Sequence, residues 1–299
     1  MKRIVTDFFM VFVLSLGTST CLVAQNLSAD RFLEGVSAHP VGDQVEKDQS
    51  GAVYRDLNSA SPTAVERLLP VVLQYTRRGN EVHARAYAAM FLTSIAIRPD
   101  GAALLASRSE EISGLITDAN PAIQRLALAT TDYVMAKAGT GKQHYVSALE
   151  VAIARTQTPQ DVALGMVEPL LSVRAEDPNA VKPVIDFIHR DDLTADTRKE
   201  LVHSLGNVDG LPEEINQQLS KELDDPDPTV RVSALVAFAD STTRFHTLAK
   251  DRVERMANDP QENPKIRDLA KEAIAGKTNL NPNVLVPNVE IPADKPNDH

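Results

Sequence analysis

Three Asx-Pro dipeptides, Asn120-Pro121, Asp227-Pro228 and Asn263-Pro264, open copies of one pattern along this chain. An Asn or Asp side chain can accept a hydrogen bond from an unpaired N–H at the start of a helix, and Pro fits the first helical position. After each Pro come a β-branched residue at the second position, a polar or basic residue at the third and Ala at the sixth. These are Ile123, Val230 and Ile266, then Gln124, Arg231 and Arg267, then Ala127, Ala234 and Ala270. The recurrence predicts a repeated helical module rather than one enzyme core.

Three weaker copies start at Asn80, Gln160 and Ala195. The six starts, at 80, 121, 160, 195, 228 and 264, are therefore 41, 39, 35, 33 and 36 residues apart. Two short helices and two turns fit these spacings, and such self-similarity is the signature of stacked helical pairs. Each start predicts the beginning of the second helix of a pair. The first helices are expected at 63–78, 100–117, 142–156, 179–189, 211–223 and 243–257.

The motif Asp-x-Asn/Asp-Pro-x-Ile/Val-Gln/Arg, at residues 118–124 and 225–231, resembles HEAT repeats of the armadillo-like superfamily. The resemblance covers residues 63–275 and implies an all-α fold, a right-handed α-solenoid of about six HEAT-like helical pairs. It also implies a ladder of Asp and Arg residues that links the turns of adjacent repeats. The candidates are Asp118, Asp192, Asp225, Arg198, Arg231 and Arg267. As exposed ion pairs, we expect them to contribute only ~0.2–1 kcal/mol each.

Residues 1–24 are typical of a secretory signal peptide, because Lys2 and Arg3 precede an apolar run and small residues follow up to Ala24. We expect cleavage after Ala24 and export to the periplasm or the extracellular space. Two alternatives are an uncleaved anchor and a lipoprotein cleaved before Cys21, the only cysteine. The apolar run is shorter than the roughly 20 residues of a membrane span, so no stable span is expected after processing.

The segments that flank the repeats differ from them in composition. Residues 25–62 are expected to form a polar linker and N-terminal cap, with a short helix from Asp30 to Glu34. Phe32 and Leu57 are among the apolar residues that can cover the open end of the first pair. Residues 276–299, rich in Pro and Asn, predict a disordered tail. The alternative is that Val284 to Ile291 docks on a partner.

Charge and motifs exclude several classes of function. The formal net charge of −10 and the lack of a basic run argue against a nucleic-acid partner. No two histidines have the i, i+3 or i, i+4 spacing of ligands on one helix face, so we expect no metal site of that kind. The acidic run Asp224, Asp225 and Asp227 lacks the spacing of a calcium loop and is explained by capping and the ladder. No glycine-rich phosphate loop is present, and no cofactor is expected.

These observations favour an exported, non-enzymatic scaffold or adaptor that binds a protein or peptide along the concave face lined by the second helices. The binding residues are expected among the exposed polar positions of those helices: His83, Arg85, Asp132, Lys199 and His203. One alternative is a lyase-type or ligand-binding protein with a small molecule in the groove, as a resemblance to phycobilin lyases would imply. Another is a purely structural envelope spacer. The sequence does not name the partner, the oligomeric state or the exact compartment.

Overall fold

The computed structural model describes residues 29–38, 57–174, 176–241 and 244–285, which contain helices, turns and no β-strand. The chain forms two compact units, Met1–Phe187 and Ile188–His299, and each is described by itself. The expected signal peptide, residues 1–24 with Cys21, lies outside the described residues. So do residues 39–56 of the expected linker and residues 286–299 of the expected tail. The fold is all-α and built from helical pairs, as the repeat pattern predicts.

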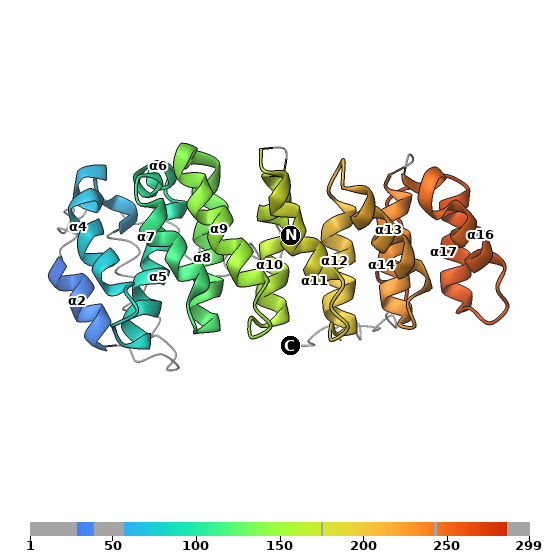
Figure 1. Ribbon diagram of the computed structural model, residues 1–299, viewed down its shortest axis with the longest axis horizontal. Helices are drawn as coiled ribbons and strands as arrows, with labels where there is room; N and C mark the ends of the chain where they lie inside the picture. Colours follow the sequence, from blue (N-terminus) through green and yellow to red (C-terminus); the bar gives the residue numbers. More distant parts are fainter. Residues whose placement is uncertain (1–28, 39–56, 175, 242–243, 286–299) are drawn as a thin grey trace, which may run out of the picture. The chain divides into compact units, whose positions relative to one another are not determined.

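Unit 1 contains three complete helical pairs (Figure 1). Helix α4 (Pro62–Tyr75) pairs with α5 (Val82–Ile97). The short helices α6 (Gly101–Ala106), α7 (Ser109–Ser113) and η1 (Gly114–Thr117) precede α8 (Pro121–Val134). After the turns η2 (Met135–Lys137) and η3 (Gly139–Gly141), α9 (Lys142–Ile153) pairs with α10 (Gln160–Ser172). The turn η4 (Pro178–Ala180) and helix α11 (Val181–Ile188) follow at the end of the unit.

Unit 2 continues the alternation of first and second helices. Its second helices are α12 (Ala195–Gly206), α14 (Pro228–Ala239) and α17 (Pro264–Ile274). The first helices are α13 (Glu213–Lys221) with the turn η5 (Glu222–Asp224), and the π-helical turn η6 (Phe245–Ala249) with α16 (Lys250–Asn258). Within each unit the second helices pack in series, α5 on α8 and α8 on α10, and then α12 on α14 and α14 on α17.

The starts of the second helices agree with the sequence pattern at five of the six copies, residues 121, 160, 195, 228 and 264. At the three Asx-Pro copies the side chain caps the helix as expected: Asn120, Asp227 and Asn263 each accept a hydrogen bond from the N–H two residues later, at 2.8–2.9 Å. The first copy is wrong by two residues. Helix α5 begins at Val82, not at Asn80, because Asn80 uses its side-chain amide to bond the carbonyls of Gln74 and Arg77 in the preceding turn.

Positions in each second helix are counted from its first residue, which is position 0, so that position 6 lies six residues after it. Position 6 is fully enclosed: Ala127, Ala234 and Ala270 are at most 1% exposed. In α5 the same position is Ala88, at 0% exposure, once the helix start is corrected to Val82. The small side chain lets neighbouring helices approach closely, which is the packing that the repeated Ala predicts.

The expected first helix at residues 100–117 is broken into α6, α7 and η1. Four hydroxyl groups in this stretch donate to the carbonyl three residues earlier, those of Ser107, Ser109, Ser113 and Thr117. Such local bonds compete with the regular i to i−4 bonds of an α-helix. The helix is therefore interrupted twice, although its ends lie close to those expected.

Helix α2 (Ala29–Ala38) caps the first helical pair. It is longer than the expected helix from Asp30 to Glu34 and continues through Gly35. Phe32 is 1% exposed, and its ring lies 5.3–5.8 Å from the rings of Tyr75, Tyr87 and Phe91 in α4 and α5. Aromatic pairs at these separations are favourable beyond their buried area. Helix α2, which lies near the start of the expected cap at residues 25–62, thus packs on the first helical pair.

The described part of the expected tail, residues 276–285, packs on unit 2. Leu280 is 3% exposed, and the backbone N–H of Asn279 donates to Asp240 Oδ1 at the end of α14 (2.8 Å). Lys265 at the start of α17 donates to the carbonyl of Val284 (3.0 Å). The prediction of a disordered tail is therefore wrong for these residues, because one buried Leu and two polar contacts hold them.

Candidate functional site

The second helices share one stripe of mostly exposed side chains, which we call the outward face, at positions 1, 4, 8, 11 and 12. Position 11 of α5 and of α10, Thr93 and Leu171, and position 12 of α5, Ser94, are buried and are left out of it. Most of these positions recur every three or four residues, about one turn, and so share one side of a helix. In unit 1 the face comprises His83, Ala86 and Met90 of α5, Ala122, Arg125, Ala129, Asp132 and Tyr133 of α8, and Asp161, Leu164 and Glu168 of α10. We take the part on α8 and α10 as the candidate binding surface.

Two carboxylates form the charged centre of this surface. Asp132 on α8 and Glu168 on α10 are exposed, and no described Lys, Arg or His lies within ion-pair distance of either. The pKa of Asp132 is raised to about 7, chiefly because packed protein atoms displace water around the carboxyl and secondly because the Glu168 carboxylate repels its charge. The residue still reaches solvent, so water moderates this shift. The arrangement favours a positively charged or hydrogen-bond-donating ligand group at this point.

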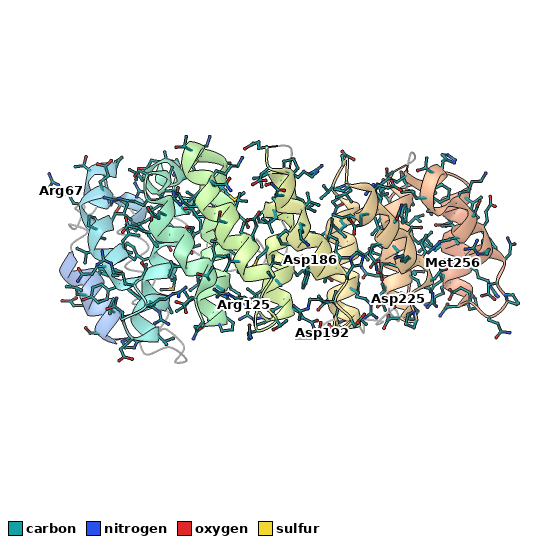
Figure 2. All side chains as sticks on the ribbon, in the orientation of Figure 1. Arg67, Arg125, Asp186, Asp192, Asp225 and Met256 are labelled. Atoms are coloured by element: carbon teal, nitrogen blue, oxygen red, sulfur yellow. The ribbon has the colours of Figure 1, made fainter. Side chains whose placement is uncertain are left out.

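Tyr133 and an ion pair flank the two carboxylates. Tyr133 is 44% exposed, so its ring and hydroxyl are accessible to a ligand. At the other end of the helices, Arg125, which Figure 2 labels, donates to Asp161 Oδ2 at 2.7 and 3.0 Å. Both members of this pair are more than half exposed, so it contributes ~0.2–1 kcal/mol and fixes the surface only loosely.

The five expected binding residues are divided between the two units, three in unit 1 and two in unit 2. His83 and Asp132 lie on the outward face of unit 1, where His83 is half-buried on α5. Lys199 and His203 lie one turn apart on the outward face of α12 in unit 2. Lys199 approaches Glu200 at 3.8 Å, and the backbone carbonyl of His203 accepts a bond from Asn207. Of the five, Asp132 alone belongs to the candidate binding surface.

The expectation that Arg85 is an exposed binding residue is wrong, because Arg85 is only 9% exposed and does not face solvent. Its guanidinium donates to the carbonyls of Arg78 and Asn80 and lies 3.2 Å from both carboxylate oxygens of Asp118 in the next repeat. The corrected start at Val82 places Arg85 at position 3, which is the ladder position. The two-residue error in the first copy made a structural Arg look like a binding residue.

The ladder residues link neighbouring repeats with more burial than expected. Arg198 donates to both oxygens of Asp225 (2.8 and 3.3 Å) and to the carbonyl of Leu193. Arg231 forms a bidentate pair with Glu262 (2.7 and 2.8 Å) and donates to the carbonyls of Asp225 and Pro226. The side chains of Arg231 and Glu262 are only 17% and 9% exposed, so the expectation of a weak exposed pair is wrong for Arg231.

Two ladder candidates bond to residues of their own turn. Asp192 accepts from Arg190 two residues earlier, at 2.8 and 2.9 Å, and position 3 of α10 is Ala163, whose side chain has no donor to offer. Arg267, in the last repeat, donates to the carbonyls of Asp259 and Pro260. Asp118 and Asp225 also accept from the backbone N–H two residues later, which closes the turn before each second helix.

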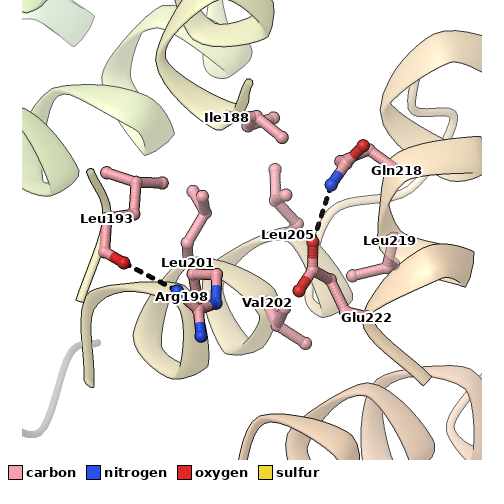
Figure 3. A pocket seen from close by; sticks show the side chains of 9 residues that line it. All are labelled: Ile188, Leu193, Arg198, Leu201, Val202, Leu205, Gln218, Leu219 and Glu222. Carbon is pink, nitrogen blue, oxygen red and sulfur yellow. Dashed lines mark hydrogen bonds between the residues drawn. The ribbon is translucent and has the colours of Figure 1, made fainter. Parts of the chain in front are cut away.

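A small apolar pocket lies in unit 2 between α12 and α13 (Figure 3). It has room for about one water molecule. Leu193, Leu201, Leu205 and Leu219 line it, and Glu222 is at its edge, where it accepts a bond from Gln218 at 2.7 Å. Burial is the largest cause of the raised pKa of Glu222, and the nearby Asp225 carboxylate adds to it. The pocket is too small for a cofactor or substrate.

No group of three or more His, Cys, Asp and Glu side chains that could hold a metal ion occurs among the described residues. None of the described helices is long and apolar enough to cross a membrane. In the acidic run at residues 224–227, Asp225 and Asp227 are engaged by Arg198 and by backbone N–H groups. The geometry of this run is that of a turn rather than an ion site.

Sequence reasoning missed Glu168, Tyr133 and Glu262. Glu168 and Tyr133 stand at positions 8 and 12 of helices whose starts were correct, so their outward positions follow from the count. Glu262 comes directly before the capping Asn263, whereas the ladder acid was sought three residues before the Pro. Glu262 thus stands two residues before Pro264, one residue later than the expected ladder position.

The chain is an all-α protein built from stacked helical pairs. No family model and no curated protein matches it. Solved structures similar to it include two designed armadillo repeat proteins, one of them designed for modular peptide recognition, with TM-scores of 0.45 and 0.46. Each is 18% identical, with 70% of this chain and 99% of the other covered. An engineered protein is also similar, with a TM-score of 0.45, 18% identity, and 82% and 68% of the two chains covered.

Proposed function

We propose that this protein is a non-enzymatic scaffold or adaptor that binds a protein or peptide on the outward face of α8 and α10. The observation that carries the proposal is the cluster of Asp132, Tyr133 and Glu168, three exposed side chains on two packed second helices. Exposed Tyr is enriched in surfaces that a partner covers, and two carboxylates with no described cationic partner can pair with basic groups of that partner. Stacked repeats supply the rigid platform on which such a surface is held.

A binding role fits the chemistry of the described residues better than catalysis does. The raised pKa of Asp132 is the kind of shift that active sites also use. However, the carboxylates lie on an open helix face, and the small apolar pocket is in unit 2. A general acid or base acts on a substrate held in a water-excluding cleft. We therefore assign the pair to recognition.

A photo-crosslinking residue at position 133 tests the proposal, with the same residue at position 151 as the matched control. Val151 on α9 is 48% exposed, as Tyr133 is 44% exposed, but it lies on a first helix of the same unit. We expect a discrete crosslinked partner from the native host at 133 and none at 151. The Asp132→Asn, Glu168→Gln double variant should lose the crosslink. Equal capture at the two positions, or capture that survives the double variant, would contradict the proposal.

We also propose that the protein is exported and processed near Ala24, on the grounds of the charged start and the short apolar run. N-terminal sequencing of protein from its native host should begin at or close to Gln25. A chain that starts at Met1, or at a lipid-modified Cys21, would overturn this part of the proposal without affecting the binding surface.

A further inference from the structure

The C-terminal segment, residues 276–285, crosses the outward face of unit 2. Gly276 (φ 79°) and Asn279 (φ 52°) adopt left-handed conformations directly after α17, which turn the chain back. The segment then meets Asp240, position 12 of α14, through the N–H of Asn279. Five residues later it meets Lys265, position 1 of α17, through the carbonyl of Val284. These two positions mark opposite ends of the outward face.

The distances agree with such a path. Helix α14 has 12 residues and is about 18 Å long at 1.5 Å per residue. The five residues from Asn279 to Val284 can span at most about 17 Å, and the long Lys265 side chain extends the reach. The segment therefore runs from the end of one second helix to the start of the next, across the stripe between them.

The face of α14 beneath this path differs from those of the other second helices at position 4. Val232 at position 4 is 1% exposed, and Ala239 at position 11 is 8% exposed. Position 4 is half-buried or exposed in the other five second helices, where it is Ala86, Arg125, Leu164, Lys199 and Asp268. The packing of neighbouring second helices is common to the repeats, so it does not explain this one exception. Cover by the segment that carries the buried Leu280 would account for it.

We infer that the outward face of α14 and α17 is a peptide-docking surface for an Asn-rich segment that has no acidic residue and carries a Leu flanked by Asn, and that residues 276–285 occupy it in cis. In trans, the occupant is the same kind of segment from a second copy of this chain. The chemistry matches, because a Leu side chain suits Val232 and Val236, while Asp240 accepts a backbone N–H and Lys265 donates to a backbone carbonyl. Main-chain contacts supply affinity and the buried side chain supplies selectivity.

The tether explains why a free segment does not displace the resident one. A segment joined by a few residues has an effective concentration in the millimolar range, far above that of a free peptide. The surface is thus blocked in the intact chain and becomes available when the resident segment is released. This inference concerns unit 2 and stands independently of the surface proposed in unit 1.

A labelled peptide with the sequence of residues 277–285 tests the inference against the full-length chain and its Leu280→Asp variant. We expect the variant to bind the peptide at least about tenfold more tightly than the parent does, because its own segment no longer competes. A peptide that carries the Leu280→Asp change should bind neither chain. Equal binding of the peptide to both chains, or binding to neither, overturns the inference.

Circular dichroism of the variant serves as the check on folding. If Leu280→Asp lowers the helical signal, Leu280→Ala, which shortens the buried side chain of the resident segment and leaves the surface residues Asp240 and Lys265 intact, replaces it. The same result, at least about threefold tighter binding than in the parent, is then required. Crosslinking at position 133 in unit 1 should be unchanged in every variant, so the two proposals fail separately.

Discussion

The outward faces of α8 in unit 1 and α14 in unit 2 occupy the same place in their repeats and differ in what they expose. At position 4, α8 has an exposed Arg125 and α14 has Val232 at 1% exposure. At position 11, α8 has an exposed Asp132 and α14 has Ala239 at 8% exposure. The repeat therefore determines the backbone and the buried side of each second helix, whereas the outward side can be either exposed and polar or apolar and buried.

The largest effect is expected where the two faces differ most, at position 4. Val232→Asp places a charge in a covered apolar site and should cost about 3–5 kcal/mol of unfolding free energy, as for an unpaired buried charge. Arg125→Ala at the same position of α8 should cost under ~1 kcal/mol, because the pair with Asp161 is exposed. Urea denaturation of both variants checks this. Similar costs at the two positions would refute the distinction between covered and open faces.

The next largest effect concerns the ladder of Asp and Arg residues that links the turns of adjacent repeats. Arg231→Ala leaves the nearly enclosed Glu262 carboxylate without its bidentate partner and should cost about 3 kcal/mol. This is larger than the value for an exposed pair that the sequence suggests. Arg267→Ala is the matched control, since Arg267 bonds the carbonyls of an exposed turn, and should cost under ~1 kcal/mol. A cost for Arg231→Ala as small as that of the control would mean that the Arg231–Glu262 pair is as weak as an exposed one.

Substitutions at position 6 should cost a similar unfolding free energy in both units, whereas those at position 4 should not. Ala234→Leu adds three carbons at a site with 0% exposure and should cost about 1–3 kcal/mol, and Ala127→Leu in unit 1 should cost about the same. Ala129→Leu, on the outward face of α8, is the control and should be nearly neutral. Hydrogen exchange should also be faster in the repeats that flank residue 234. A silent Ala234→Leu would mean that the assignment of the repeat is wrong.

The smallest effect is a pH dependence specific to the open face. Because the folded-state pKa of Asp132 is raised to about 7, its contribution to stability is present below the ordinary value near 4 and is lost as pH rises through about 7. Asp132→Asn should therefore become more stabilising, relative to the parent, between pH 4 and pH 7 and level off above. Denaturation midpoints at pH 5 and pH 8 provide the comparison. In a Glu168→Gln background the change should move to lower pH, and a pH-independent difference would contradict burial and repulsion as the causes of the raised pKa.

The inner side of the repeats is predictable from sequence because it obeys one packing rule. Ala at position 6 and Asx-Pro at the start recur for steric and hydrogen-bonding reasons, so five helix starts and the three Asx caps agree with the structure. The interruptions of residues 101–117 depend on local hydroxyl bonds, which a helical pattern does not reveal. The start of α5 was placed two residues too early, at Asn80, because Asn is common both at helix caps and in the turns that precede them.

The outward side is less predictable, because its environment depends on chain segments far away in sequence. Nothing near Val232 in the sequence indicates that it is buried, and the residues that we infer to cover it lie about 50 positions later, around Leu280. The polar composition of residues 276–285 suggests disorder, yet one Leu and two polar contacts hold them on unit 2. Asp132 was found because it is polar at an outward position, and the same reasoning wrongly selected Arg85.

Thiol labelling at position 4 tests the contrast between the two faces most directly. In a Cys21→Ser background, Arg125→Cys in α8 should react freely, and Val232→Cys in α14 should react at least about tenfold more slowly because its site opens only transiently. Adding Leu280→Asp should raise the rate at Val232→Cys towards that at Arg125→Cys and leave the latter unchanged. If Val232→Cys reacts as fast as Arg125→Cys in the parent background, or stays protected when Leu280 is replaced, then the C-terminal segment does not cover the outward face of unit 2.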